Sequence, residues 1–247
     1  MRECSEEIKF RVEFIKKCIK EAGASGVVFG NSGGKDSALV GALCKMACDN
    51  TVGIIMPCGS ARRYGLDRRD ALEVAEKFGI ETLTVDVSPI KDAMKKSLDG
   101  VCDLTDGASA NINPRLRLSV LYAVAASKNL LVAGTGNKSE IYMGYFTKWG
   151  DGGCDFNPIA DLCVGEVYEL LRFIGAPACV IDKAPSAALY DGQTDESDMG
   201  VSYAEIDSYI AGGDCSDEAK KIIGRYHFRS AHKRAFPATP TGNGYET

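Results

Sequence analysis

Histidine is scarce in this sequence, and cysteine, although more frequent, lacks paired spacing. There are two histidines, and none of the ten cysteines has a second cysteine at CxxC spacing. Because a structural zinc site usually uses such pairs, we expect no structural metal. A chain of 247 residues can also bury a sizeable core without disulfides. We therefore expect the cysteines to be reduced and mostly buried.

Long runs of one residue class are missing too. The net charge of −5 comes without a long basic stretch, which argues against an extended nucleic-acid-binding surface. No apolar window approaches the length of a membrane span, and the opening MRECSEEIKF carries acids where a secretion signal carries its basic flank. The sequence predicts a cytoplasmic protein that binds neither nucleic acid nor membrane.

Four short apolar runs, rich in β-branched residues, alternate with segments of helical periodicity. The runs are GVVFG at 26–30, TVGIIMP at 51–57, TLTVDV at 82–87 and LLVAG at 130–134. Nearly continuous apolar strands are typical of a parallel sheet that helices cover on both faces. We therefore expect an α/β fold, a three-layer sandwich with a central parallel sheet.

Two helical segments beside these strands carry further expectations. An apolar stripe of Ile8, Val12, Ile15 and Ile19 predicts a first helix whose stripe is either core or a subunit interface. Pro114 predicts the start of a helix over 113–127, because a missing N–H costs nothing in the first turn.

The character of the chain changes after Gly150. Over 151–247 glycine, aspartate and proline punctuate two predicted helices, near 164–174 and 216–226, and no strong strand is visible before a frayed tail, PATPTGNGYET. No low-complexity linker and no repeat interrupts the sequence. We expect one domain over 1–247, with a core at 1–150 and a mostly helical appendage at 151–247.

The run GVVFG leads directly into NSGGKDS and then into a helical segment. Backbone N–H groups and a helix N-terminus therefore converge at one point, where they favour a phosphate. Gly33 and Gly34 permit close backbone approach, while Ser32, Ser37 and Lys35 add hydroxyl donors and positive charge. The sequence predicts a phosphate site in this loop.

Asp36 is the unexpected member of the loop. A carboxylate repels phosphate unless a cation lies between them, which predicts that Asp36 binds Mg²⁺; the alternative is that Asp36 caps the helix. A Walker A motif is excluded because Asp36 separates Lys35 from Ser37. A dinucleotide fingerprint at Gly134 is disfavoured because Ser139 stands where its third glycine belongs.

The string SGGKDS resembles the SGGxDS signature of the N-type ATP pyrophosphatases. Further blocks resemble the NAD synthetase family, in that family's order: NINPRLR (111–117), GTGNKSE (134–140), GYFTKWGDGGCDFNPIADL (144–162), APSAALYDGQTDESDMGVSYAEID (184–207) and HKR (232–234). The resemblance implies an adenine nucleotide alpha-hydrolase-like, Rossmann-like fold. It also implies a C–N ligase that adenylates deamido-NAD with ATP and then uses ammonia to form NAD, AMP and pyrophosphate.

The resemblance assigns site residues in three groups. ATP is expected at Gly30, Asn31, Ser32, Gly33, Gly34, Lys35, Asp36, Ser37, Thr135 and, in a predicted lid, Ser186. Mg²⁺ is expected at Asp36 and Glu140. Deamido-NAD is expected at Arg115, Lys148, Asp155, His232 and Lys233, with Asp36, Lys148 and Asp155 in catalytic roles.

Several alternatives stay open at this stage. Another N-type pyrophosphatase, acting on a purine nucleotide or tRNA, and a non-catalytic ATP-binding module share the loop. Val164 replaces a lysine that contacts ATP in many members, so Lys35 or Lys183 is a candidate to compensate. Asp151 or Asp155 is a candidate to deprotonate ammonium. The family also implies a homodimer.

Overall fold

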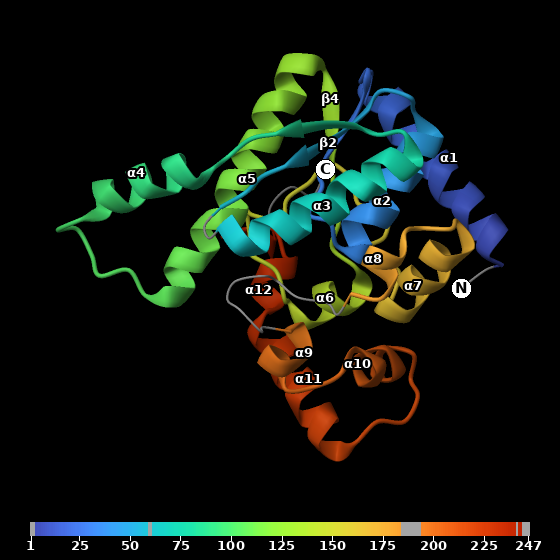
Figure 1. Ribbon diagram of the computed structural model, residues 1–247. Helices are drawn as coiled ribbons and strands as arrows, with labels where there is room; N and C mark the ends of the chain where they lie inside the picture. The colour runs from blue at the N-terminus through green and yellow to red at the C-terminus, as the bar shows by residue number, and fades with distance from the viewer. Residues whose placement is uncertain (1–2, 59–60, 184–193, 241, 244–247) are drawn as a thin grey trace.

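The computed structural model describes residues 3–58, 61–183, 194–240 and 242–243. Its centre is a parallel sheet of strands β1 (Gly26–Gly30), β2 (Thr51–Ile55), β3 (Glu81–Thr84) and β4 (Leu130–Ala133) in the order β3-β2-β1-β4. Helices lie on both sides of this sheet (Figure 1). The three-layer α/β sandwich predicted from the apolar runs is confirmed.

The strand order brings the ends of two distant strands together. In the parallel register Val28 pairs with Val52 on one side and Val132 on the other. Because β2 follows β1 to one side and β4 lies on the other, the loops leaving β1 and β4 diverge at a topological switch point, where open α/β folds bind ligands. The predicted third strand, 82–87, ends at Thr84, although Val85 N still donates to Ile55 O.

Alternating side chains of β1 reach different cores. Val27 and Phe29 join a cluster with helices α1 (Cys4–Ala22), α2 (Lys35–Ala47), α3 (Ala61–Phe78) and α7 (Val164–Phe173). Val28 faces the other side, where residues of α5 (Asp106–Lys128) cover the sheet. This is the period of two expected for a buried strand. The stripe of α1 packs in the first cluster, with Ile15 fully buried, which agrees with the core alternative.

The start of α5 differs from the prediction. The helix begins at Asp106, and Thr105 caps it by accepting a hydrogen bond from Ala108 N at 3.2 Å. Pro114 therefore lies inside the helix, where it deprives the Ala110 carbonyl of its donor, and does not open it. The cap at Thr105 supplies the start that the sequence analysis assigned to proline.

Helices dominate the C-terminal third. Besides α7 they are α8 (Ala178–Ile181), α9 (Asp195–Met199), α10 (Tyr203–Ile210), α11 (Asp217–Arg229) and α12 (Ala231–Arg234). Earlier in the chain, α6 (Lys138–Met143) follows β4 and α4 (Ser88–Leu98) precedes α5. The helices predicted near 164–174 and 216–226 are confirmed as α7 and α11. The tail differs, because the short strands β5 (Ala238–Thr239) and β6 (Gly242–Asn243) pair there.

Two further expectations concern the burial of the cysteines and the division of the chain at residue 150. All ten cysteines are free, but only Cys44 is fully buried and Cys102 is exposed, so their burial is less complete than predicted. Residues on both sides of Gly150 contribute to the first core cluster, which includes Phe156 and Leu170. The division at residue 150 stays a prediction. Among the described helices none combines the length and apolarity needed to cross a bilayer.

Candidate active site

Helix α3 packs against the loop that follows β1. Gly33 has φ 74°, and a Cβ there would lie 2.4 Å from the Asp67 carbonyl oxygen, so only glycine fits without displacement. Buried Asn31 donates from Nδ2 to Ala71 O at 3.0 Å. Ser37 Oγ donates to Gly34 O at 3.0 Å and lies 3.0 Å from Ser32 Oγ. The predicted phosphate loop is therefore a rigid turn at the N-terminus of α2.

Asp36 does not cap that helix. The N-cap residue of α2 is Gly34, and the Asp36 carboxylate points to other partners. Its Oδ2 lies 2.7 Å from Lys35 Nζ, and its Oδ1 accepts from Asn137 Nδ2 at 3.2 Å. Glu140 Oε1 lies 4.0 Å from the same Lys35 ammonium. The two predicted metal ligands thus meet around one buried lysine.

Helix α6 presents Glu140 at this point through its own N-terminal geometry. Asn137, the N-cap, accepts from Glu140 N at 3.0 Å, and Glu140 Oε2 accepts from Asn137 N at 3.2 Å, which is a reciprocal capping box. Since α6 follows β4 at the switch point, the capping box places the Glu140 carboxylate beside the end of β1. Thr135 and Gly136 lie in the connection between β4 and this cap.

Electrostatics couple the three charged groups. Burial raises the pKa of Glu140 well above its usual range, the Asp36 charge adds to the effect, and Lys35 opposes it. Burial alone would lower the pKa of Lys35, but the Asp36 and Glu140 charges outweigh it and raise that pKa. The raised pKa of Glu140 indicates that one ammonium does not balance two ionised carboxylates in this buried cluster.

Three residues of this cluster were missed in the sequence analysis. Tyr203 covers Lys35, with Nζ 5.5 Å from the ring centroid, and its hydroxyl donates to Asp195 Oδ2 at 3.1 Å. Both side chains are buried. Asn137 had a local signal, since it stands three residues before Glu140 as a capping box requires. Asp195 and Tyr203 lie in the block 184–207 that resembles the family, but no local pattern singled them out, because only the tertiary fold brings them to Lys35.

A second group of predicted residues gathers beyond the C-terminal end of α6. Lys148 Nζ donates to the carbonyl oxygens of His232 and Ala235, and Arg115 Nη2 donates to Lys148 O at 3.4 Å. Lys233 Nζ donates to Gly144 O and to Phe146 O, each at 2.8 Å. The structure thus brings the side chains of Arg115, Lys148 and Lys233 together, while His232 joins them through its backbone carbonyl.

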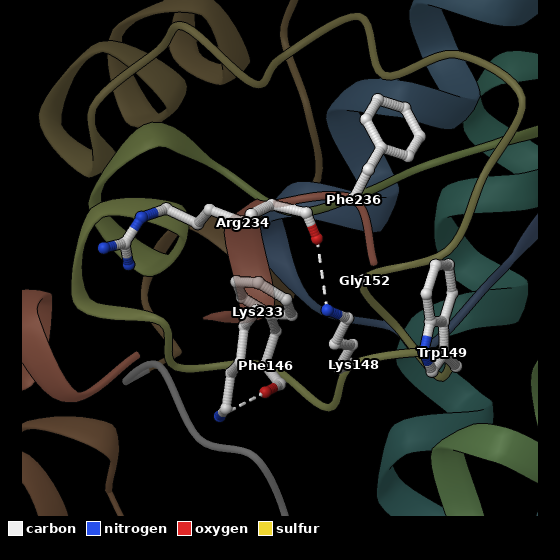
Figure 2. Close-up of a pocket in the computed structure, with 8 residues that line it drawn as sticks. Phe146, Lys148, Trp149, Gly152, Lys233, Arg234 and Phe236 are labelled. Carbon is white, nitrogen blue, oxygen red and sulfur yellow. Dashed lines mark hydrogen bonds between the residues drawn. The ribbon is translucent and has the colours of Figure 1, made fainter. Parts of the chain in front are cut away.

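Lys148 and Lys233 of this group line a pocket of about 160 Å³ (Figure 2). Aromatic and cationic residues line it: Phe146, Lys148, Trp149, Lys233, Arg234 and Phe236. Trp149 has φ 59°, a conformation uncommon for a bulky residue, and its ring is largely exposed. The pocket offers flat surfaces and positive charge to a planar, anionic ligand.

The carboxylate of Asp155 hydrogen-bonds to residues outside both groups. Its Oδ2 accepts from Val132 N at 2.7 Å, and its Oδ1 accepts from the Tyr122 hydroxyl at 3.0 Å. The carboxylate therefore binds the outer edge of β4, where Asp155 N also donates to Val132 O and Phe156 forms a parallel bridge with Ala133. Asp151, the other candidate base, accepts from Thr147 N at 2.8 Å through Oδ1 and shapes the loop after Lys148.

The remaining predicted contacts are distributed as follows. Ser186 falls outside the described residues. Val164 is buried in the third core cluster. Lys183, a candidate to compensate for Val164, lies 2.7 Å from Asp67 Oδ1 and 2.8 Å from Asp70 Oδ2. It therefore pairs with α3 beneath the phosphate loop.

Comparisons with known proteins match nearly the whole chain. The NAD synthase family model matches residues 7–237. The NH(3)-dependent NAD(+) synthetase of Carboxydothermus hydrogenoformans is 42% identical over 238 residues, covering 95% of this chain and 97% of that protein. The corresponding protein of Archaeoglobus fulgidus is 42% identical over 231 residues, covering 91% and 92%.

Solved structures agree with these relatives. NMN synthetase from Francisella tularensis superposes with a TM-score of 0.92 at 38% identity, covering 97% of this chain and 99% of that one. An NH3-dependent NAD synthetase from Campylobacter jejuni gives 0.80 at 28% identity, covering 97% and 99%. With a family model over most of its length and relatives above two-fifths identity, this chain belongs to the NAD synthase family.

Proposed function

We propose that this chain is an ammonia-dependent NAD synthetase, a ligase that forms a C–N bond at the expense of ATP. The observation that carries the proposal is the meeting of Asp36 and Glu140 around Lys35, beside a glycine loop at the switch point of the sheet. Full-length relatives carry that name, and the chain spans 97% of one of them.

The donor set fits Mg²⁺ in its usual role with nucleotides. Mg²⁺ takes one or two carboxylates and completes its shell with phosphate oxygens and water. No described group of three or more His, Cys, Asp or Glu side chains could hold a metal by itself, so Asp36 and Glu140 would hold the ion together with ATP. When bound, Mg²⁺ supplies positive charge that neutralises the phosphates.

The chain's own groups then position the reaction. The loop amides at Ser32–Ser37 and the N-terminus of α2 would bind the phosphates, and Lys35 would add positive charge where negative charge grows. The nicotinate carboxylate attacks the α-phosphorus and pyrophosphate leaves; ammonia then attacks the acyl carbon and AMP leaves. Catalysis is chiefly positioning and charge neutralisation, without a covalent enzyme intermediate.

The second group of residues supports a nucleotide acceptor. Helix α6 has six residues, which corresponds to about 9 Å, and it links the Asp36–Glu140 cluster to the pocket of Lys148 and Lys233. One bound acceptor would then place its phosphates near Arg115 and its carboxylate near ATP. Lys148 would bind the acceptor. Asp155 would support the loop that carries Lys148 by binding β4, and the experiment below tests whether Asp155 also contacts the acceptor directly.

A nicotinate mononucleotide is the second candidate acceptor. The structural similarity to NMN synthetase, with a TM-score of 0.92, exceeds the 0.80 found for the NAD synthetase from Campylobacter jejuni. Both acceptors share the nicotinate ribose phosphate, so the adenylation and amidation chemistry would be identical. The two candidates differ in whether the site also binds an adenylate half.

We also propose that two copies form a homodimer through α4. This helix buries none of its side chains, projects from the body (Figure 1), and exposes Ile90 and Met94, while Val101 just beyond it is 72% exposed. Such an apolar arm favours a protein partner. A single catalytic domain over 1–247 and a cytoplasmic location complete the proposal.

The function is tested by following pyrophosphate release from Mg-ATP with ammonium and one acceptor at a time. Deamido-NAD, nicotinate mononucleotide and XMP are compared at equal concentrations. Release with deamido-NAD supports the proposal, and preference for the mononucleotide selects the second candidate. Release with XMP alone, or with none of the three, would reject both, and Asp155→Asn should raise the acceptor KM if Asp155 contacts the acceptor.

A further inference from the structure

One carboxylate joins three helices beside the Asp36–Glu140 cluster. Asp207 of α10 accepts from Ser139 Oγ of α6 at 2.5 Å through Oδ1 and from Gly165 N of α7 at 2.8 Å through Oδ2. Val164 N also donates to Ser139 Oγ at 3.4 Å. Ser139 is fully buried and Asp207 is half-buried, so the bond between them is partly shielded from water, whereas the bond to the Gly165 amide is exposed.

The bond to Gly165 fills the anion position at the N-terminus of α7. The first amides of a helix lack intrahelical acceptors and favour negative charge. Here Ser139 takes the Val164 amide and Asp207 takes the Gly165 amide. The first turn of α7 is therefore satisfied from within the protein, and Asp207 is held firmly in place.

The bond to Ser139 acts on the cluster through a very short helix. Ser139 lies directly between Asn137, whose side chain contacts Asp36, and Glu140. An isolated helix of six residues is unstable in water. The direction of the Glu140 carboxylate therefore depends on what anchors α6, and Asp207 supplies a charge-assisted bond in the middle of its first turn.

Asp207 acts on the opposite side of Lys35 as well. Tyr203, which covers the Lys35 ammonium, lies one helical turn before Asp207 on α10. Residues four apart share a helix face, so anchoring Asp207 also anchors Tyr203. The Asp207 carboxylate is therefore connected both to α6, which carries Glu140, and to Tyr203, which covers Lys35.

We propose that Asp207 is a positioning residue that, through Ser139, holds Glu140 and Asn137 in the geometry that binds Mg-ATP. This inference rests on the proposed magnesium site. Asp207 touches neither ATP nor metal, so its loss should weaken binding of Mg²⁺ and leave the chemical step nearly unchanged once the ion saturates.

The test uses Asp207→Asn, Ser139→Ala and the double variant in the full-length chain. Asp217→Asn is the matched control, because Asp217 is an exposed carboxylate in the first turn of α11. Thermal stabilisation by an ATP analogue with a methylene bridge between its α and β phosphates is measured across Mg²⁺ concentrations. This readout requires neither acceptor nor turnover.

The expected result is an increase of about tenfold in the Mg²⁺ concentration for half-maximal stabilisation in either single variant. The double variant should show no further increase, because both changes break one connection, and kcat at saturating Mg²⁺ should stay within about threefold of wild type. The control should match wild type.

Two outcomes overturn the inference. One is an unchanged Mg²⁺ dependence in folded single variants, and the other is full additivity in the double variant. If Asp207→Asn does not fold, Ser139→Ala alone decides. A wild-type protein that does not respond to the analogue with Mg²⁺ would overturn the proposed function as well, whereas a responsive wild type with unaffected variants overturns this inference alone.

Discussion

Asn137 Nδ2 donates a hydrogen bond to Asp36 Oδ1 at 3.2 Å across 101 positions of sequence. Asn137 is also the N-cap of α6, so the same side chain starts the helix that carries Glu140 and restrains the carboxylate in the phosphate loop. The switch point of the sheet makes this contact possible, because it places the ends of β1 and β4 side by side.

Removing the charge of Asp36 should abolish ATP cleavage. Asp36→Asn deletes half of the proposed metal site while Glu140 still faces Lys35, so we expect pyrophosphate release to fall by at least about 100-fold with the fold retained. Circular dichroism checks the fold. Asp49→Asn, a neutralised carboxylate just beyond the end of the same helix, should retain full activity; equal losses in both variants would contradict the assignment.

Glycine at position 33 should be essential for the loop. Gly33→Ala places a methyl group against the Asp67 carbonyl at φ 74°, so we expect a loss of more than about 1 kcal/mol in unfolding free energy and a raised KM for ATP. Gly79→Ala is the control, since φ is 67° there and nothing lies within 4 Å of the added Cβ. It should show the backbone cost alone, measured by urea unfolding.

Lys148 should affect the acceptor and spare ATP. Lys148→Met keeps the aliphatic length beside Trp149 and removes the ammonium, so we expect the KM for the acceptor to rise by about tenfold or more. Steady-state kinetics with each substrate varied in turn separates the two KM values. An increase confined to the KM for ATP would place Lys148 in the other half of the site.

The acid limb of the stability curve should depend on Asp161. Burial opposes ionisation there, but the hydrogen bond and charge of buried Arg11, 2.6 Å away, lower the pKa of Asp161. A lowered folded-state pKa contributes stability that is present above the unfolded pKa of about 4 and is lost as pH falls through the folded value.

Asp161→Asn should therefore destabilise the protein near neutral pH by less than about 1 kcal/mol, because the Asp161 side chain is 68% exposed. The difference from wild type should disappear at pH values below the folded pKa. Urea unfolding at a series of pH values measures both. A difference that grows on acidification would show that Arg11 does not stabilise the ionised carboxylate.

Local sequence patterns predicted those elements whose bounds depend on neighbouring residues alone. The run GVVFG predicted the bounds of β1, because a buried parallel strand is continuously apolar and a glycine stands at each end of the run. The prediction from Pro114 placed the start of α5 too late. The Thr105 cap lies eight or more positions upstream, and the proline lies within the helix. Tyr203 and Asp195 could not be found, because their role exists only once α9 and α10 lie against Lys35.

The family resemblance reached further than local patterns but left individual roles open. It grouped Lys148, His232 and Lys233, which the structure brings together, with Asp155, whose carboxylate binds the edge of β4. Sequence spacing cannot separate a side chain that faces a ligand from one that supports the neighbouring loop. The contact of Asp155 with Val132 N depends on the pairing of the sheet, which the sequence does not display.

The central claim is that a nicotinate carboxylate is activated by AMP on this protein before ammonia attacks. Acceptor nucleotide labelled with ¹⁸O in its carboxyl group tests it, with mass spectrometry of the products formed from Mg-ATP and ammonium. We predict that one labelled oxygen appears in AMP for each carboxamide formed. Label in pyrophosphate, or a carboxamide formed while AMP stays unlabelled, would contradict the account.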